Sequence, residues 1–331
     1  MKKIGVIGAT GMLGHHVARE VIAQGNELYV IHRAKSKLAR ISDLNYKARV
    51  ASLNDSESLI YACEGLDYVI NCGAYYPIKP EPLKKELKIA RRQINHFIKA
   101  IKKSGVKKAL YVGAAIAIPQ ASDGIADETL VYDEPPADKA AYIQVKWLMD
   151  KLVRDAGQGG VPVVIGIPGM TFGEYDYGPS TGRLIVNAAN ETLPGYVEGH
   201  RNLVYAGDAA KGLLAACLEG TPGERYLITG ENISIGQIIG QVLEQMEIKT
   251  SPPVVPLFKA RLKCRYNMLK YRLFGGDLPL LDDTALAVMS SGQYLNGEKA
   301  KNFLGYQAQV SSKQTIARTI QWFKEVGYIK R

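Results

Sequence analysis

In the first half of the chain, short runs of β-branched and apolar residues alternate with longer segments in which apolar residues recur every three or four positions. Such runs predict buried strands, and such segments predict amphipathic helices. The predicted strands are residues 3–7, 27–32, 48–51, 68–72, 109–112 and 161–166, and the predicted helices are residues 12–23, 56–63, 83–103 and 137–156. This alternation predicts an α/β fold with a doubly wound parallel sheet.

The regular alternation ends after Pro168. Residues 169–199 are rich in Gly, Pro and Tyr, which is typical of loops that line a binding cleft. A predicted strand (202–205), helix (208–218) and strand (225–228) follow and are expected to rejoin the sheet, and the chain from Glu231 onward is mostly helical, with a last helix at 314–326. We therefore predict a larger domain of residues 1–168, rejoined by 197–231, and a smaller, mostly helical C-terminal domain of residues 169–196 and 232–331.

The composition of the 331 residues is that of an ordinary globular protein, because 47% are hydrophobic and 22% are charged. No run approaches the roughly 18 apolar residues of a membrane span, and Met1–Gly8 leads into a strand rather than a signal peptide, so we predict a cytoplasmic protein. Neither the four cysteines nor the five histidines have a metal-ligand or disulfide spacing, so we expect no metal site.

The strongest chemical signal is the segment Gly8-Ala9-Thr10-Gly11-Met12-Leu13-Gly14, which follows a predicted strand and opens a predicted helix. In this context the glycine spacing predicts a dinucleotide site on a Rossmann fold. Gly8 permits the sharp turn, Gly11 lets the backbone approach a pyrophosphate, and Gly14 allows close packing of helix on strand. The N–H groups at the helix N-terminus would bind the pyrophosphate. The predicted cofactor contacts here are Gly8, Thr10, Gly11, Met12, Leu13 and Gly14.

The end of the second predicted strand indicates which dinucleotide is bound. An acidic residue there would accept a hydrogen bond from the ribose 2′-OH, but the chain reads His32-Arg33-Ala34-Lys35-Ser36-Lys37. Arg33 offers a planar fork for a 2′-phosphate, and two lysines add positive charge. NADP(H) is therefore favoured over NAD(H). The alternative is that this segment is only a basic, solvated turn.

Tyr142 and Lys146 lie four residues apart and hence on one helix face. A nearby ammonium stabilises a phenolate and lowers the tyrosine pKa toward the range of a general acid or base. The spacing alone is a common coincidence. Its position after the fifth strand of a dinucleotide fold makes it specific.

These features resemble the extended short-chain dehydrogenase/reductase family, in the group of dihydroflavonol-4-reductase-like proteins and NAD-dependent epimerases/dehydratases. The similarity extends over nearly the whole chain. The motifs that carry it are the three glycines, Arg33, Tyr142 with Lys146, Val163–Gly173, Pro179–Arg183, Gly207–Ala210 and Gly223–Tyr226.

The resemblance implies that Tyr142 donates or accepts a proton and that Lys146 orients the nicotinamide ribose and lowers the tyrosine pKa. Hydride would move between the nicotinamide and a carbonyl or alcohol carbon. The resemblance further implies cofactor contacts from three other segments. They are Leu53 after the third strand, Cys72, Gly73 and Ala74 after the fourth strand, and Pro168 and Met170 after the sixth strand.

The chain departs from the family at Ala114. Relatives have a Ser or Thr at this position, and its hydroxyl binds the substrate oxygen beside the tyrosine. By analogy with an oxyanion donor, its absence would cost on the order of 10² to 10³ in turnover. Possible substitutes are the hydroxyls of Ser122, Thr171, Tyr75 and Tyr76, although each of these also suits loop or cleft-wall packing.

Two arginines lie in the segments that line the substrate cleft in the resembling proteins. An arginine there suits a phosphate or carboxylate group of the substrate. Arg201 is the first choice for an anchor and Arg183 the second; either is equally suited to an ion pair with an acid such as Asp208. Tyr75 and Ala114 are further expected substrate contacts. A nucleotide-sugar, a carboxylated small molecule and a hydrophobic alcohol all remain open as substrates.

Two basic segments carry much of the net charge of +10. Residues 79–108 read as an amphipathic helix with a solvated face, and no aromatic platform accompanies the charge, so nucleic-acid binding is not expected. Residues 257–273 combine six basic residues with large apolar ones; we expect an apolar stripe that caps the cleft, with contact to an anionic membrane surface as the less favoured alternative. By analogy with the family, residues 83–103 and 137–156 are expected to pair across a homodimer axis.

The sequence thus predicts an NADP(H)-dependent oxidoreductase, or a related epimerase or dehydratase, that acts on a small molecule such as a nucleotide-sugar or a ketone. The alternative is an NADP(H)-binding sensor or partner protein in which catalysis is weakened, as the missing hydroxyl at Ala114 suggests.

Overall fold

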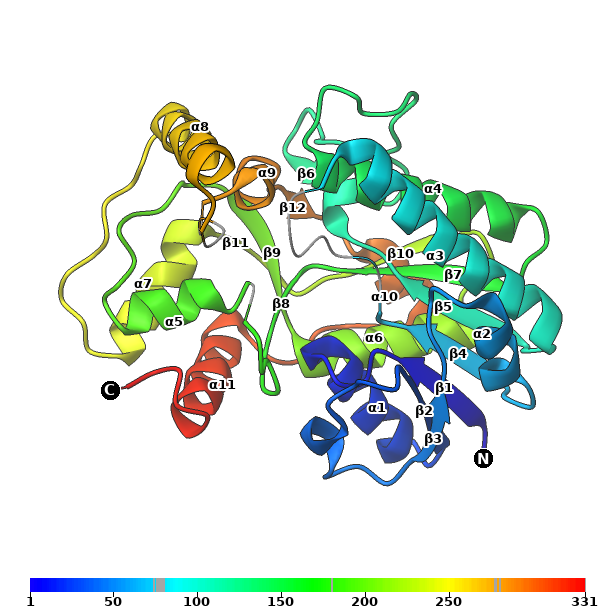
Figure 1. The fold of residues 1–331 in the computed structure, drawn as a ribbon. Helices are drawn as coiled ribbons and strands as arrows, with labels where there is room; N and C mark the ends of the chain where they lie inside the picture. Colours follow the sequence, from blue (N-terminus) through cyan, green and yellow to red (C-terminus); the bar gives the residue numbers. More distant parts are fainter. Residues whose placement is uncertain (74, 76–80, 180, 277–278, 280, 331) are drawn as a thin grey trace.

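A seven-stranded parallel sheet forms the centre of the larger part of the molecule (Figure 1). The computed structural model describes residues 1–73, 75, 81–179, 181–276, 279 and 281–330. In sheet order, the strands are β3 (Lys47–Val50), β2 (Glu27–His32), β1 (Lys3–Ile7), β4 (Tyr68–Asn71), β5 (Lys108–Val112), β7 (Val163–Pro168) and β10 (Arg225–Ile228). All neighbouring pairs are parallel, which confirms the predicted doubly wound fold.

Helices cover both faces of this sheet. On one face, α1 (Met12–Ala23) packs against α6 (Ala206–Glu219); on the other, α3 (Leu83–Ser104) packs against both α2 (Ser56–Cys63) and α4 (Ala141–Gln158). Each helix buries an apolar stripe, for example Ile94, Phe97 and Ile101 of α3. Strands buried on both sides have continuous apolar sequences, which is why the pattern predicted them well.

The helix predicted at 137–156 begins four residues later, at Ala141. Pro135 and Pro136 start two tight turns, in which the N–H groups of Ala137 and Lys139 donate to the proline carbonyls. Proline fixes its own φ and disfavours helix in the residue before it, so the chain turns before the helix can start.

The smaller domain is built on a second sheet of three strands. In sheet order these are β11 (Glu231–Ser234), β9 (His200–Tyr205) and β8 (Met170–Phe172), and they pack with α5 (Arg183–Ala189), α7 (Ile235–Gln245) and α11 (Ser312–Glu325) around a separate apolar core. The remaining elements are the 3₁₀ turns η1 (Leu38–Ile41) and η2 (Ala115–Ala117), the paired strands β6 (Ile125–Ala126) and β12 (Tyr294–Leu295), and helices α8 (Leu257–Phe274), α9 (Asp283–Ser290) and α10 (Glu298–Leu304).

The expectation that the strand at 202–205 rejoins the main sheet is wrong, because β9 pairs with β8 and β11 instead. Of the segment 197–231, only α6 and β10 join the larger body. The chain leaves the main sheet at Gly169, where a side chain would collide with the backbone and side chain of Asn202. This close approach aligns β8 with β9 and not with the main sheet.

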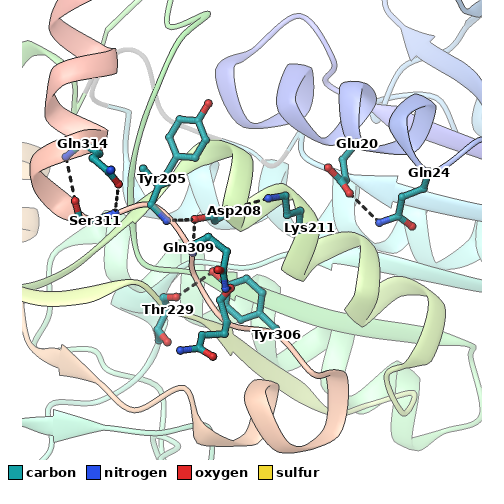
Figure 2. Close-up of polar contacts among 12 residues, drawn as sticks. Glu20, Gln24, Tyr205, Asp208, Lys211, Thr229, Tyr306, Gln309, Ser311 and Gln314 are labelled. Atoms are coloured by element: carbon teal, nitrogen blue, oxygen red, sulfur yellow. Dashed lines mark hydrogen bonds and ion pairs between the residues drawn. The ribbon is translucent and has the colours of Figure 1, made fainter.

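A buried carboxylate ties the C-terminal segment to the larger body (Figure 2). Asp208, near the start of α6, accepts hydrogen bonds from the backbone N–H groups of Gln309 and Val310, at 2.7 and 2.8 Å, and pairs with Lys211. The hydroxyl of Tyr306 donates to the carbonyl of Thr229 over 3.0 Å. These bonds position the chain directly before α11, so the smaller domain is anchored to α6.

Aromatic rings connect α1 with the segment after β8. The rings of His15 and Tyr175 stack with centroids 3.7 Å apart, and Tyr175 has a φ of 68°, a conformation that a bulky residue adopts only when its surroundings hold it. His16 lies beside Glu174, with 3.6 Å between the ring Nε2 and a carboxylate oxygen. Burial lowers the pKa of His16 to about 4, although Glu174 opposes this shift.

The pKa of His16 predicts an acid-sensitive junction. Below about pH 6.5 the unfolded chain protonates His16, whereas the folded protein resists protonation down to about pH 4. The free energy of unfolding should therefore fall as the pH decreases through this interval, by on the order of 1 to 3 kcal/mol. Denaturant titrations of the wild type and His16→Gln should show a shallower decline in the variant. His32→Gln serves as the matched control, and an unchanged slope in His16→Gln would contradict the assignment.

Candidate cofactor and active site

The parallel sheet gathers the predicted site segments at one edge. In a parallel βαβ arrangement, every turn that follows a strand lies at the carboxyl ends of the strands. The turns after β1, β4 and β5 therefore share one edge, and the helices α1 and α4 begin there. The strand order changes direction between β1 and β4, which is the position where open sheets of this kind bind ligands.

The turn between β1 and α1 depends on backbone groups in close contact. Gly8 has a φ of 86°, and a side chain there would lie 3.0 Å from the backbone nitrogen of Gly73. A methyl group on Gly14 would overlap the carbonyl oxygen of Gly8. The two glycines thus let α1 begin directly at the end of β1, beside the loop after β4.

The N-terminus of α1 has the features of an anion site. Its N-cap residue is Gly11, no side chain caps the helix, and no acidic residue lies in its first turn. A side chain on Gly11 would meet only one described atom within 4 Å, the carbonyl oxygen of Gly8 at 3.6 Å. The first-turn N–H groups of Met12 and Leu13 are thus left for a ligand, which suits a pyrophosphate.

Arg33 is an exposed residue in the turn directly after β2. Its backbone is fixed by Ser36, whose hydroxyl accepts from the Arg33 N–H at 3.1 Å and whose N–H donates to the Arg33 carbonyl. Among the described residues, no carboxylate pairs with the Arg33 guanidinium. The turn therefore holds a positive charge at the end of β2 without neutralising it.

The loop after β4 begins with a buried asparagine. Asn71 accepts the N–H of Gly73 on its Oδ1 at 2.9 Å, and its buried Nδ2 has no hydrogen-bond partner within the described part of the chain. Cys72 follows, and burial raises the pKa of its thiol to about 12, so it remains protonated. Ala74 and Tyr76 lie outside the described residues. Leu53 packs partly buried against the core.

Tyr142 and Lys146 occupy the first turns of α4. The Lys146 Nζ lies 5.6 Å from the centroid of the Tyr142 ring and donates to the carbonyl of Tyr75 at 3.0 Å. Burial lowers the pKa of Lys146 to about 8. A buried ammonium that bonds to a carbonyl of the β4 loop thus sits beside a half-buried phenol, on a helix that begins at the sheet edge where the cofactor turn lies.

An ion-pair network that the sequence did not predict holds α4 in place. Asp150, one turn after Lys146, is buried and pairs with Arg154 at 2.9 Å and with Arg225 of β10 at 3.5 Å. Arg225 also donates to the carbonyls of Glu128 and Leu130, in the segment that leads into α4. No sequence signal identifies this network, because its members come from three distant segments.

Ala114 caps the short η2 turn with its carbonyl, which accepts the N–H of Ala117 at 2.9 Å. Its side chain carries no hydroxyl, as the sequence showed. Of the suggested substitutes, Ser122 is exposed in a turn, and Thr171 is a partly buried residue of β8.

The two substrate-side arginines differ in their surroundings. Arg201 is buried and donates to the carbonyls of His200, Val288 and Met289, so it ties β9 to the last turn of α9. Arg183 is exposed at the start of α5. Neither forms the suggested ion pair with Asp208 among the described residues, because Asp208 binds the backbone before α11. Pro168 and Met170 flank the crossing between the two sheets.

The fold and this site define a dinucleotide-binding enzyme of the short-chain dehydrogenase type. Residues 4–229 match the family described as NAD dependent epimerase/dehydratase, so the chain belongs to that family. Its members are enzymes that bind a nicotinamide dinucleotide.

Relatives and solved structures support this membership. A solved nucleoside-diphosphate-sugar epimerase from Pseudomonas aeruginosa is 36% identical, with a TM-score of 0.87 over 99% of both chains. A protein of Synechocystis sp., provisionally named dihydroflavonol 4-reductase, is 28% identical over 98% of this chain and 95% of its own length. Sterol demethylase protein B of Methylococcus capsulatus is 26% identical over 98% of this chain and 99% of its own.

The turn geometry predicts different consequences for two glycine substitutions. Gly14→Ala forces a methyl group against the Gly8 carbonyl, so the free energy of unfolding should fall by about 1 to 3 kcal/mol. Gly11→Ala makes only an ordinary van der Waals contact, 3.6 Å from the Gly8 carbonyl oxygen, so it should cost about 1 kcal/mol or less, but it should weaken dinucleotide binding. Thermal unfolding and equilibrium cofactor titration separate the two effects. Equal destabilisation by both substitutions would contradict this description of the turn.

Proposed function

We propose that this protein is an NADP(H)-dependent enzyme of the extended short-chain type that acts at a carbonyl or hydroxyl carbon of a small molecule, such as a ketone or a nucleotide-sugar. The observation that carries the proposal is the pair of Tyr142 and Lys146 on α4, placed at the same sheet edge as the uncapped N-terminus of α1. A phenol beside a buried ammonium can exchange a proton with a substrate oxygen.

In this proposal, the cofactor contacts come from four segments of the chain. The segment from Gly8 to Gly14, which ends in the first turn of α1, would hold the pyrophosphate through backbone N–H groups. Leu53, Cys72 and Gly73 would lie along the dinucleotide, and Pro168 and Met170 would contact its nicotinamide end. Ala74, the further contact that the resemblance implies, lies outside the described residues. When bound, the nicotinamide supplies or accepts a hydride.

Tyr142 manages the proton on the substrate oxygen, and Lys146 supports it electrostatically. With a pKa near 8, Lys146 is mostly charged at neutral pH, and its positive charge favours the phenolate form of its neighbour. Its bond to the Tyr75 carbonyl keeps the ammonium in place before substrate arrives. Arg183, which is exposed, is the better anchor for an acidic substrate group, since the bonds of Arg201 are used within the fold.

Arg33 selects the phosphorylated cofactor in this proposal. Arg33→Ser should weaken NADP⁺ binding by about 10- to 100-fold, because a charged hydrogen bond to phosphate contributes about 1.5 to 3 kcal/mol, and should leave NAD⁺ binding nearly unchanged. Fluorescence titration with both cofactors measures this difference. Arg91→Ser, on the exposed face of α3, is the matched control. Equal weakening of both cofactors by Arg33→Ser, or a wild type that prefers NAD⁺, would reject the role.

Tyr142→Phe should lower kcat by about 10² to 10⁴ and leave cofactor affinity unchanged, because only the proton-transfer group is removed. Loss of NADPH absorbance with a panel of ketones and nucleotide-sugars provides the assay. Tyr61→Phe, at a position that is 71% exposed on α2, controls for loss of a phenol. Full activity in Tyr142→Phe would remove Tyr142 from the mechanism.

A second candidate function rests on Ala114, where the hydroxyl is missing. In that case the protein binds NADP(H) as a sensor or as a partner of another protein, and its catalysis is weak. The substitution Ala114→Ser distinguishes the two functions in the same assay. A rise in turnover with any accepted substrate favours the enzyme, whereas no gain on any substrate favours the sensor.

A further inference from the structure

Helix α8 presents large apolar side chains to solvent. Their spacing of three or four residues places them on one face of the helix. This set, the α8 stripe, has exposed fractions between 57% and 69% and consists of Phe258, Leu262, Tyr266, Leu269 and Leu273. Phe274, which is 80% exposed, extends the apolar surface at the end of the helix. A surface helix normally turns such residues toward the core, so α8 has the reverse arrangement.

The opposite face of α8 holds the helix on the protein. Ala260, Cys264 and Met268 are buried, α8 packs against α9, and the thiol of Cys264 donates to Asp283 over 3.7 Å. Small and flexible residues therefore make the internal contact. Of the apolar residues that were expected to cap the cleft, Met268 is buried, whereas Phe258, Leu262 and Leu269 are exposed to solvent.

Basic residues border the α8 stripe on both sides. With 3.6 residues per turn, Lys259, Lys263 and Lys270 follow one border, and Arg261, Arg265 and Arg272 follow the other. All six are exposed, none forms an ion pair with a described residue, and the helix contains no acidic residue. The result is an apolar ridge between two positive rows.

We propose that α8 docks the protein onto the surface of an anionic lipid bilayer. The helix would lie in the interfacial plane, with the α8 stripe at the boundary of the acyl chains and the two basic rows at the phosphate headgroups. Lysine and arginine suit this position, because their stems extend along apolar surface while their charges remain among the headgroups. None of the described helices has the length and apolar character to cross a bilayer, so the contact is peripheral.

Charge and geometry favour a lipid surface over a second copy of the chain. A symmetric dimer formed through this face would bring like-charged rows together, six positive charges from each copy. An anionic bilayer neutralises both rows and covers the stripe in one step. Figure 1 shows α8 at the upper edge of the smaller domain, next to α9, where a flat surface can reach it.

Vesicle flotation with the full-length protein tests the proposal. The wild type should bind phosphatidylcholine vesicles that contain 30% phosphatidylserine, bind pure phosphatidylcholine much less, and dissociate as the salt concentration rises. Leu262→Asp with Leu269→Asp should reduce the partition coefficient roughly tenfold or more. Lys259→Gln with Arg265→Gln should reduce it by about fivefold for each charge removed.

Matched controls come from other helices. Phe303→Asp alters an apolar side chain on α10 that is 74% exposed, and Lys88→Gln with Arg91→Gln removes two exposed charges from α3. Both controls should bind vesicles as the wild type does, with unchanged thermal unfolding for all variants. The proposal is overturned if the wild type does not bind anionic vesicles or if the controls lose binding equally. It is also overturned if Leu262→Asp with Leu269→Asp dissociates an oligomer in sedimentation without changing vesicle binding. Loss of NADPH oxidation would concern the proposed function and leave this result unaffected.

Discussion

The backbone contact between Gly8 and Gly14 is the constraint on which the rest of the structure depends. It allows α1 to start directly after β1, so the uncapped end of the helix lies at the carboxyl edge of the sheet. Because the sheet is parallel, the same edge collects the loop after β4 and the start of α4. A side chain at Gly14 would push the helix away from the end of the strand, and a side chain at Gly8 would push the turn away from the loop after β4.

Burial defines the electrostatics of the proposed active site. The buried ammonium of Lys146 donates a hydrogen bond to the Tyr75 carbonyl. One turn further along α4, the carboxylate of Asp150 pairs with Arg154 and with Arg225 of β10. Buried charges are stable only when such partners are present. The network around Asp150 therefore fixes the helix that carries Tyr142 and Lys146, and it joins that helix to the edge strand β10.

The two basic helices α3 and α8 show that tertiary packing decides which face of a helix is buried. In α3, the apolar residues Ile94, Phe97 and Ile101 are buried against the sheet, and the charges face solvent. In α8, the small residues Ala260 and Cys264 face the protein, and the large apolar residues are left outside. From the sequence alone, both segments are predicted to be amphipathic helices. Only the direction in which the helix docks separates a core helix from a surface that can bind a partner.

The sequence by itself determined the sheet, the glycine turn and the spacing of Tyr142 and Lys146. Each of these depends on local periodicity or on residues near one another in the chain, and the strands and first helices appear within a few residues of their predicted bounds. The tertiary structure decided the rest. It placed β9 in a second sheet and directed the hydrogen bonds of Arg201 to carbonyls of α9. It also brought together the ion pairs of Asp150 and left the α8 stripe exposed. These features join segments that are distant in sequence, and local patterns carry no information about which distant partner a residue meets.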